Sequence, residues 1–582
     1  MTSISKLRLL ALIAVLALVA AACGGGSGED DDTEVDDATE STDEEAAEDG
    51  ADEGTDDEAM AEEEPTDEES TDDEGTEDEG ASGGDEVLVF GTTEMPSTID
   101  PADVYEKFAS DVLFNTTNRL VEFEPGAGDI GPGLATSWEV SEDGLTYTFD
   151  LREGVVFQDG SEMTSEDVVW SLNRSLNINH PDGASFLISG ITSIEAPDDL
   201  TVVITIEEAN STFLSRLNYT VGTILPSDSD VYQAPEERLE AEGEDEAAAE
   251  TLLEEAESFL TQDAIVGTGP YEMTDYQPGV SMTLERFDDY WGEAPQIGTV
   301  RVQFFESTTQ MRNALAAGEI DMAVNDLDPT ETASLEGEEG IQIATDAGGR
   351  TSYMVVDVTQ APFDDPAVRR AIATTIDRER IVEEAFEGQA SPLFSMIPEN
   401  FDVSMDFISD IEVEIEPESP IEFELWYPAD RYTNQAEVAE IIARSLNESG
   451  LFNVTTNTSE WATEYSTQLN TGAYGIYLLG WYPDYLDPDD YIEPFYDSEK
   501  TFIGFYGSEE MDALITAEQQ AEVGSDERAE IFADIQELAA QDMPFIPLYS
   551  EGQEAYYNER VTGVEETLGA AQQTWFYVLG LN

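Results

Sequence analysis

The residues best suited to bind a ligand lie between Gly480 and Tyr491, where aromatic rings alternate with carboxylates (Gly-Trp-Tyr-Pro-Asp-Tyr-Leu-Asp-Pro-Asp-Asp-Tyr). This stretch follows an apolar, β-rich run, so we expect it where a buried strand reaches the surface. Asp484 stands among Trp481, Tyr482 and Tyr485. A carboxylate in such surroundings could pair with a cation, because partial desolvation strengthens the attraction. The alternative interpretation is a solvated loop with surface tyrosines.

The other three carboxylates of this stretch have local structural explanations. Asp487 directly precedes Pro488, which fits a helix N-cap followed by proline at the first helical position. Asp489 and Asp490 then fall in the first turn, where negative charge suits the helix dipole. Only Asp484 lacks such a role, which makes it the candidate ligand-binding carboxylate.

Composition excludes several classes of function. The chain of 582 residues carries 132 acidic and 21 basic residues, a net charge of −111. Lysine occurs only at Lys6, Lys107 and Lys500, so there is no basic cluster for the phosphates of a nucleic acid. Histidine and cysteine occur once each, at His180 and Cys23. We therefore expect no Cys/His metal site, no Ser-His or Cys-His nucleophilic pair, and no cofactor.

The N-terminus is typical of a secretion signal. Lys6 and Arg8 precede an apolar run over residues 9–22 that is shorter than the roughly 20 residues of a membrane-spanning helix. The run ends at Cys23, directly after three alanines, which resembles the lipobox of bacterial lipoproteins, although Ala20 stands where leucine is usual. The alternative is an ordinary secreted protein with an accidental cysteine. We expect residues 1–23 to be a lipoprotein signal peptide and lipobox that anchor the protein through Cys23 to the outer face of the cell membrane.

Residues 24–86 differ abruptly in composition from the rest of the chain. They contain roughly thirty acidic residues and hardly a large apolar one. Such a segment cannot bury enough apolar surface to fold. We expect a disordered acidic tether that holds a globular body away from the membrane, with a cation sponge or a partner-binding tail as the alternatives.

Strand and helix patterns interleave after residue 86, which indicates the α/β class. Tyr147–Arg152 alternates as a half-buried strand, and Thr164–Asp167 is similar to a capping box at the start of a helix. Asp365 and Pro366 form an N-cap signal before a helix that buries Val368 and Ile372.

Eight separated blocks stand out along the chain: Ala135–Trp138, Asp143–Phe149, Phe157–Gly160, Thr164–Trp170, Gly267–Tyr271, Leu284–Trp291, Ala317–Asp321 and Pro362–Ala371. In this order they resemble the signature of family 5 extracellular solute-binding proteins, the peptide, nickel and oligosaccharide receptors of ABC importers. A match of many blocks is far more specific than one short motif, and this resemblance covers about residue 86 to the end.

The resemblance implies a two-lobed α/β clamshell, similar to periplasmic binding proteins, with an extra subdomain in the first lobe. It implies lobe I with its subdomain over residues 87–305, lobe II over 306–544, and a return to lobe I over 545–582. It further implies a monomer that captures a small solute between its lobes and delivers it to ABC permease subunits, with no reaction required.

The substrate is less sharply indicated. In peptide-binding members of the family, the aspartate of a Trp-x-x-Asp motif pairs with the terminal amine of the ligand, and Trp481-Tyr-Pro-Asp484 is similar to that motif. The alternative is an oligosaccharide stacked on Trp426, Trp461 and Trp481, each of which can equally belong to the core. Nickel or haem is disfavoured by the lone His180, except as a pre-chelated metal.

A secreted hydrolase is the opposing class of function. The sequence has no Gly-x-Ser-x-Gly elbow, no phosphate loop with lysine and no His-Glu-x-x-His motif. Carboxylates are so abundant that a pair suited to a glycosidase carries no information. We therefore expect a binding protein and no enzyme.

Overall fold

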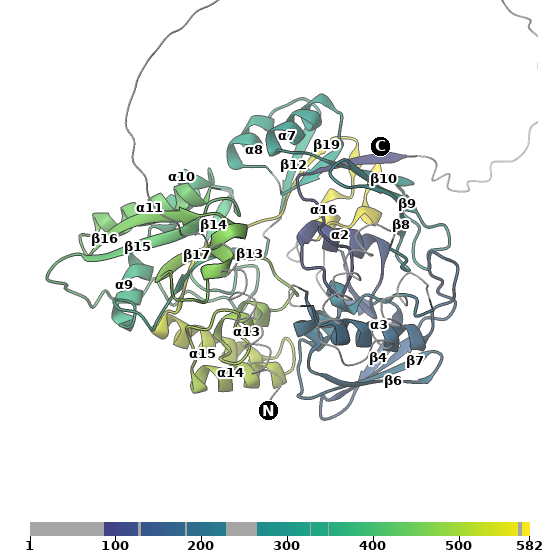
Figure 1. Cartoon of the computed structure of the whole chain (residues 1–582), viewed down its shortest axis with the longest axis horizontal. Coiled ribbons are helices and arrows are strands. Elements are labelled where there is room, and N and C mark those ends of the chain that lie inside the picture. The colour runs from purple at the N-terminus through teal and green to yellow at the C-terminus, as the bar shows by residue number, and fades with distance from the viewer. Residues whose placement is uncertain are drawn as a thin grey trace, which may run out of the picture. The chain divides into compact units, whose positions relative to one another are not determined.

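The computed structural model describes residues 86–125, 130–180, 183–228, 265–325, 327–346, 348–432, 434–568 and 573–582. These residues form two lobes, each built on its own large β-sheet (Figure 1). The expected signal peptide, the expected lipid anchor at Cys23 and the acidic tether up to residue 85 lie outside the described residues. Within the described ranges, no helix combines the length and the hydropathy needed to cross a membrane.

Lobe I is built on a seven-stranded mixed sheet. The central strand of this sheet pairs in parallel with both of its neighbours, and its Leu88 and Phe90 are buried in the core. In spatial order the strands are β12 (Ile341–Thr345), β19 (Glu554–Asn558), β11 (Met322–Val324), β1 (Val87–Thr92), β10 (Thr299–Phe304), β9 (Ser281–Arg286) and β8 (Tyr271–Gln277).

The extra subdomain of lobe I is a four-stranded antiparallel sheet covered by helix α3 (Ser165–Ile178). Its strands in spatial order are β4 (Ala135–Val140), β5 (Thr146–Leu151), β7 (Thr201–Ile206) and β6 (Ile191–Asp198). Tyr147 and Phe149 of β5 are buried against Val168 of α3, as the alternation in the sequence predicts. The capping box at the start of α3 is confirmed, because the backbone N–H of Thr164 donates to Asp167 Oδ2 at 2.7 Å.

The remaining elements of lobe I are short. Two small hairpin-like pairs are β2 (Val121–Phe123) with β3 (Ile130–Pro132), and β20 (Val561–Thr562) with β21 (Gly580–Leu581). The helices are α2 (Lys107–Thr116), α4 (Phe213–Leu217), α7 (Thr308–Ala317), α8 (Pro329–Leu335) and α16 (Val564–Thr567), with single 3₁₀ turns η1 (Ser185–Ile188), η2 (Thr220–Gly222) and η5 (Phe576–Val578).

Lobe II is built on a six-stranded mixed sheet with helices packed against it. In spatial order its strands are β14 (Ala390–Pro392), β18 (Phe545–Glu551), β13 (Arg350–Val356), β17 (Ile476–Trp481), β15 (Ile421–Pro428) and β16 (Phe452–Ser459). Its helices are α9 (Pro366–Thr375), α10 (Arg378–Ala385), α11 (Gln435–Glu448), α12 (Ser466–Gln468), α13 (Glu493–Tyr496), α14 (Glu509–Gln520) and α15 (Asp526–Asp542), with a π-helical turn η3 (Trp461–Tyr465) and a 3₁₀ turn η4 (Pro488–Tyr491).

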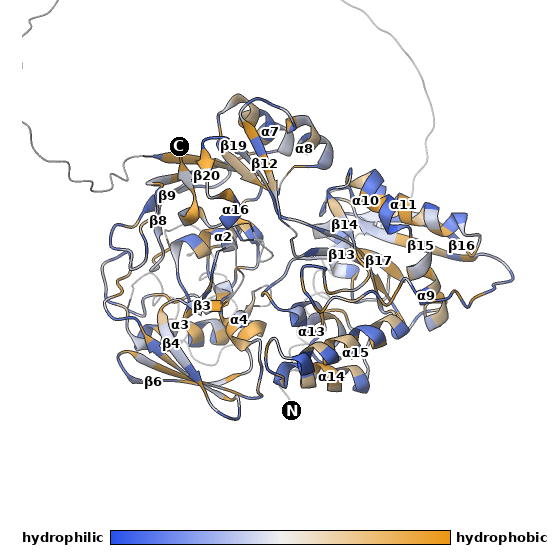
Figure 2. Ribbon diagram, turned by 180° about the vertical axis from the view of Figure 1, so that it is seen from behind, coloured by the Kyte–Doolittle hydropathy of each residue, from blue (hydrophilic) through white to orange (hydrophobic). Residues whose placement is uncertain are grey.

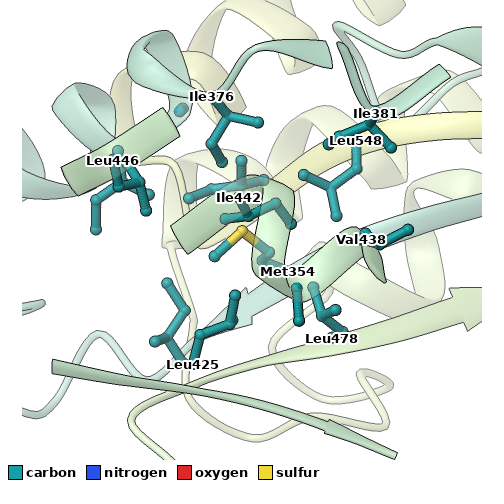
Figure 3. Packing of buried hydrophobic residues seen from close by; sticks show 14 of the residues in the cluster. Met354, Ile376, Ile381, Leu425, Val438, Ile442, Leu446, Leu478 and Leu548 are labelled. Atoms are coloured by element: carbon teal, nitrogen blue, oxygen red, sulfur yellow. The ribbon is translucent and has the colours of Figure 1, made fainter. Parts of the chain in front are cut away.

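The core of lobe II lies between the six-stranded sheet and helices α9, α10 and α11. Met354 and Leu478 from the central strands meet Val438 and Ile442 of α11 in one buried cluster (Figure 3). Hydrophilic and hydrophobic residues alternate around α10 and α11, as expected for helices that bury one face (Figure 2). Helix α9 begins as the sequence predicts, with Asp365 Oδ1 accepting from the N–H of Ala367 at 2.9 Å.

The chain crosses from the sheet of one lobe to the sheet of the other later than we expected from the sequence, which placed the lobe boundaries at 305/306 and 544/545. Strands β11 and β12 still pair in the sheet of lobe I, so the crossing falls between Thr345 and Arg350. Strand β18 pairs with β13 and β14 of lobe II, and the return to lobe I begins only with β19. The resemblance implied a return to lobe I from residue 545, whereas Phe545–Tyr549 lies in the sheet of lobe II, because the pairing of β18 with β13 and β14 decides which sheet it joins.

Candidate functional site

The segment that follows β17 places four aspartates in two different kinds of surroundings. Asp487 caps the turn η4, as predicted, with Oδ1 accepting from the N–H of Asp489 at 2.9 Å and Pro488 at the first position. The cap is only part of its role. Arg528 of α15 donates to both oxygens of Asp487 at 2.7 and 2.8 Å, and both side chains are buried. Asp487 is therefore half of a bidentate ion pair inside lobe II.

Asp489 lies in the first turn of η4, as predicted, but its main partner is a charged side chain from the other lobe. Arg216 of α4, in lobe I, donates to Asp489 Oδ2 at 2.7 Å and to Glu493 Oε2 at 2.5 Å. Burial raises the pKa of Asp489, but Arg216 and its hydrogen-bonding neighbours outweigh burial and hold that pKa at about 2. The two lobes are thus joined by a buried ionic cluster.

The side chain of Asp490 accepts two hydrogen bonds from the loop that precedes it. Its Oδ2 accepts from Trp481 Nε1 at 2.9 Å and from the N–H of Asp484 at 3.1 Å. Burial, together with the neighbouring Asp484, raises the pKa of Asp490 well above its usual range. These contacts fix the orientation of the loop between Trp481 and Asp484.

Asp484 is the one aspartate of the segment that faces a cavity. Its side chain is 6 % exposed, and Oδ2 accepts from the hydroxyl of Tyr105 in lobe I at 3.0 Å. Burial raises the pKa of Asp484 to about 7, although the hydrogen bond from Tyr105 and the charge of Arg216 act in the opposite direction. With a pKa of about 7, the carboxyl group of Asp484 can lose its proton when a cation enters the cavity.

The cavity lies between the lobes and has a volume of about 590 Å³. Lobe I contributes polar groups from the start of α2 and the loop before it, including Glu94, Lys107 and Asp111. Lobe II contributes aromatic and apolar side chains together with Asp484 and Arg431. Of the predicted ligand-binding residues, the structure brings together Asp484, Trp481, Tyr482 and Trp461 on the wall of this cavity.

The structure places the other two predicted residues elsewhere. Trp426 stacks on Tyr474, with ring centroids 4.5 Å apart, and packs against the core of lobe II. Tyr485 is 2 % exposed and packs into the hydrophobic cluster of the lobe I subdomain, where its hydroxyl contacts Arg216 and Asp489. Their aromatic character is used for packing, which the sequence pattern does not distinguish from ligand stacking.

Among the cavity residues that the sequence analysis missed are Tyr105, Lys107 and Arg431. Tyr105 had no local signal, because its partner is distant in sequence. Lys107 is one of only three lysines in the sequence, and a lysine in so acidic a chain could have been taken as a signal. Its Nζ forms an ion pair with Asp111 Oδ2 at 2.8 Å. Arg431 lines the cavity with its guanidinium 5.0 Å from the ring centroid of Trp461, and among the described residues no carboxylate forms an ion pair with it.

Metal-binding residues do not gather in the described part of the chain, where no group of three or more His, Cys, Asp or Glu side chains could hold an ion. His180, the single histidine, pairs through Nδ1 with Asp103 at 2.6 Å.

Comparisons with known proteins agree with this two-lobed arrangement. Residues 129–502 match the model of the bacterial extracellular solute-binding proteins, family 5 (middle part). The chain belongs to this family. It is therefore the solute-binding component of an ABC importer, a non-catalytic protein that works outside the cytoplasm, as the resemblance of its sequence blocks implied.

Individual relatives differ in what they bind. The chain is 26 % identical to heme-binding protein A of Haemophilus influenzae over 83 % of this chain and 90 % of that one. It is 26 % identical to the dipeptide-binding protein of Escherichia coli over 71 % of this chain and 79 % of that one. Among solved structures, a periplasmic binding protein DppA of Helicobacter pylori in complex with the peptide STSA matches with a TM-score of 0.70 and 24 % identity, over 85 % of this chain and 98 % of that one.

The ionic cluster between the lobes makes a direct prediction about stability. Arg216→Ala leaves Asp489 and Glu493 buried without their shared cation, so we expect the free energy of unfolding to fall by about 3–5 kcal/mol. Arg380→Ala is the matched control, because Arg380 forms its ion pairs with Glu384 and Glu448 at the surface and should change stability far less. Urea unfolding of the three proteins measures the difference, and equal losses in the two variants would contradict a stabilising role for the cluster.

Proposed function

We propose that this chain captures peptides with a free α-amino group in the interlobe cavity and delivers them to an ABC permease. The observation that carries the proposal is the buried Asp484 carboxyl on the cavity wall, which has aromatic neighbours and no lysine or arginine paired with it in the described residues. An α-ammonium group supplies the missing cation. The resemblance of Trp481–Asp484 to the motif of peptide-binding members supports the same role.

Arg431 supplies a complementary site at the same cavity. A guanidinium with no carboxylate partner in the described ranges can donate two hydrogen bonds to a ligand carboxylate, and the ring of Trp461 lies beside it. A peptide carries both an α-ammonium and an α-carboxylate group. One cavity with Asp484 and Arg431 on its wall therefore suits a zwitterionic ligand.

An oligosaccharide is the second candidate, because Trp461, Trp481 and Tyr482 line the cavity and could stack on sugar rings. The charges weigh against it. A neutral sugar would provide no counter-charge for the Asp484 carboxyl group or for the Arg431 guanidinium, whereas a zwitterionic peptide provides both. A chelated nickel complex or a haem, the ligand named for one relative, remains an outcome of the ligand test.

We further propose that the protein is a lipoprotein, anchored to the outer face of the cell membrane through Cys23 and held away from it by the acidic residues 24–86. The motivation is the position of the single cysteine directly after a signal-like apolar run. The tether then lets the two lobes reach solutes while remaining near the permease.

Asp484→Ala tests amine recognition. Breaking a buried ion pair costs about 3–5 kcal/mol, so the variant should bind free-amine peptides at least about 100-fold more weakly. N-acetylation of the peptide should cost the wild type a similar factor and the variant little, because both changes remove the same interaction. Calorimetric titration with paired free and acetylated peptides measures all four affinities.

The matched control for that cycle is Asp487→Asn, a buried aspartate of the same segment that does not line the cavity. It should lower stability by weakening the ion pair with Arg528 while keeping the preference for the free amine. Equal binding of free and acetylated peptides by the wild type would refute amine recognition and favour the oligosaccharide.

The same carboxyl predicts a pH dependence of binding. Because the pKa of Asp484 is about 7 in the unliganded protein, acid protonates the group that must carry the negative charge. Affinity for a free-amine peptide should fall about tenfold per pH unit as the pH drops below 7. It should also fall above pH 8, where the peptide α-amino group itself loses its proton. Titrations from pH 5 to pH 9 test this, and an acetylated peptide with the same profile would contradict it.

Cys23→Ser tests the anchor. Without the thiol no acyl chain can be attached, so the variant should leave the membrane fraction and appear in the soluble fraction, with unchanged peptide affinity. Fractionation of cells that express each form measures this. An unchanged membrane fraction would show that the anchor is not at Cys23.

A further inference from the structure

The ionic cluster between the lobes, formed by Arg216 with Asp489 and Glu493, lies outside the wall of the cavity. Arg216 is 7 % exposed, and the two carboxylates are 0 % and 5 % exposed. The cluster is therefore hidden both from solvent and from a ligand in the cavity. Any effect that it has on ligand binding acts through the arrangement of the two lobes.

Further contacts between the lobes surround this cluster. The N–H of Ser211 in lobe I donates to the carbonyl of Gln519 in lobe II at 2.7 Å. Gln519 Nε2 in turn donates to Glu493 Oε1 at 3.0 Å. On the lobe I side, Arg216 Nε donates to Thr212 Oγ1 at 2.8 Å, which orients the guanidinium. Parting the lobes would break the ion pairs and the backbone hydrogen bond together.

The cluster is remote from the two segments that connect the lobes. The chain crosses between the sheets after β12 and again after β18. Helices α4 and α13, which carry Arg216 and Glu493, lie well away from β12 and β19 (Figure 2). In a hinged movement, the parts furthest from the hinge are displaced most. Parting the lobes therefore separates the members of this cluster.

The carboxyl group of Asp484 is covered while the lobes are joined. It is 6 % exposed, and Oδ2 accepts from the hydroxyl of Tyr105, which belongs to the opposite lobe. A peptide that pairs with Asp484 must first gain access to this covered group. We therefore expect the entry and the release of a peptide to require a movement that parts the lobes.

We infer that Arg216 is a positioning residue for ligand exchange. Its ion pairs hold the lobes together in the unliganded protein, and they break each time a peptide enters or leaves. Because the cluster stabilises the joined lobes equally with and without a ligand, it slows association and release by the same factor. The statement about peptides rests on the proposed function, whereas the statement about the lobes does not.

The loss of Arg216 should affect the joined lobes more than the parted ones. Joining the lobes buries Asp489, and Arg216 compensates its charge. Glu493 keeps a second cation, Lys500. A buried carboxylate without its cation is costly, whereas water can replace the cation once the lobes part. A variant without Arg216 should therefore open more readily.

Distances between spin labels on the full chain measure whether the lobes are joined. Glu142 follows β4 in lobe I and Glu527 lies in α15 of lobe II, and both are exposed. Each is replaced by cysteine in the Cys23→Ser background, which leaves no other thiol to label. The unliganded protein should give one short distance that a peptide leaves unchanged. Arg216→Ala should add a population at longer distances.

Control variants separate the charge of Arg216 from its packing. Arg380→Ala is the matched surface control, because Arg380 pairs with Glu384 and Glu448 within lobe II, and it should keep the short distance. The double variant Arg216→Ala/Asp489→Asn should recover part of the short-distance population, since no charge is then stranded on residue 489. A residue that only fills space would give no such recovery. Melting curves verify that every variant is folded.

Peptide exchange is measured on the same variants by stopped-flow fluorescence with trialanine as the probe. Trp461 and Trp481 line the cavity and should report its occupation. In Arg216→Ala, association and release should both be at least about tenfold faster, because the lost buried ion pair no longer has to break. The affinity should change by no more than about threefold.

Several results would overturn the inference. One is an unliganded protein whose lobes are already parted, and another is an equal label distance with and without Arg216. A third is an affinity that changes as much as the rates, because the cluster would then act in the liganded protein alone. If trialanine does not bind, the proposed peptide function fails, while the label distances still decide the role of Arg216.

Discussion

The structure around the cavity depends on how five buried carboxyl groups, all within ten residues, are neutralised. Asp484, Asp487, Asp489, Asp490 and Glu493 are each at most 6 % exposed. A buried carboxylate must pair with a cation or take up a proton. Arg528 serves Asp487, and Arg216 serves Asp489 and Glu493, with Lys500 on the second oxygen of Glu493. Among the described residues, Asp484 and Asp490 have neutral hydrogen-bond partners only, and both have raised pKa values. Of these two carboxyl groups, Asp484 lines the cavity. A ligand that enters the cavity can therefore supply the missing cation.

Basic residues are scarce in this chain, and this scarcity explains why few cations serve the buried carboxyl groups near the cavity. With 21 lysines and arginines against 132 acids, most carboxylates must remain in water, and near the cavity two buried arginines are each shared between carboxylates. Arg216 and Arg528 each contact two acidic side chains. For this reason the loss of one arginine affects several groups at once, and electrostatic contributions near the cavity cannot be assigned to single pairs.

Local signals in the sequence were sufficient for the class of fold and for several element boundaries. The caps at Thr164, Asp365 and Asp487 depend on residues within three positions of each other, and all three are present in the structure. The sheet joined by Phe545–Tyr549 was predicted wrongly, because strand pairing depends on partners far away in the chain.

The same limit applies to the candidate site. Asp484, Trp481, Tyr482 and Trp461 line one cavity as grouped from the sequence, whereas the partnership of Asp484 with Tyr105 spans 379 positions and leaves no local pattern.

The first residues of the segment after β17 affect ligand binding, and the later ones affect the contact between the two lobes. Trp481, Tyr482 and Asp484 line the cavity, so a change there alters contacts available to a ligand. Tyr485, the next residue, enters the hydrophobic cluster of lobe I, and Asp489 pairs with Arg216 of that lobe. These contacts between the lobes do not need a ligand. They stabilise the joined lobes by a fixed amount, and a ligand adds only its own differential affinity for that arrangement. Asp484 belongs to both sets, because it also accepts a hydrogen bond from Tyr105 of lobe I. The range of solutes accepted can therefore change through the other residues of the cavity wall with little effect on the energy that joins the lobes.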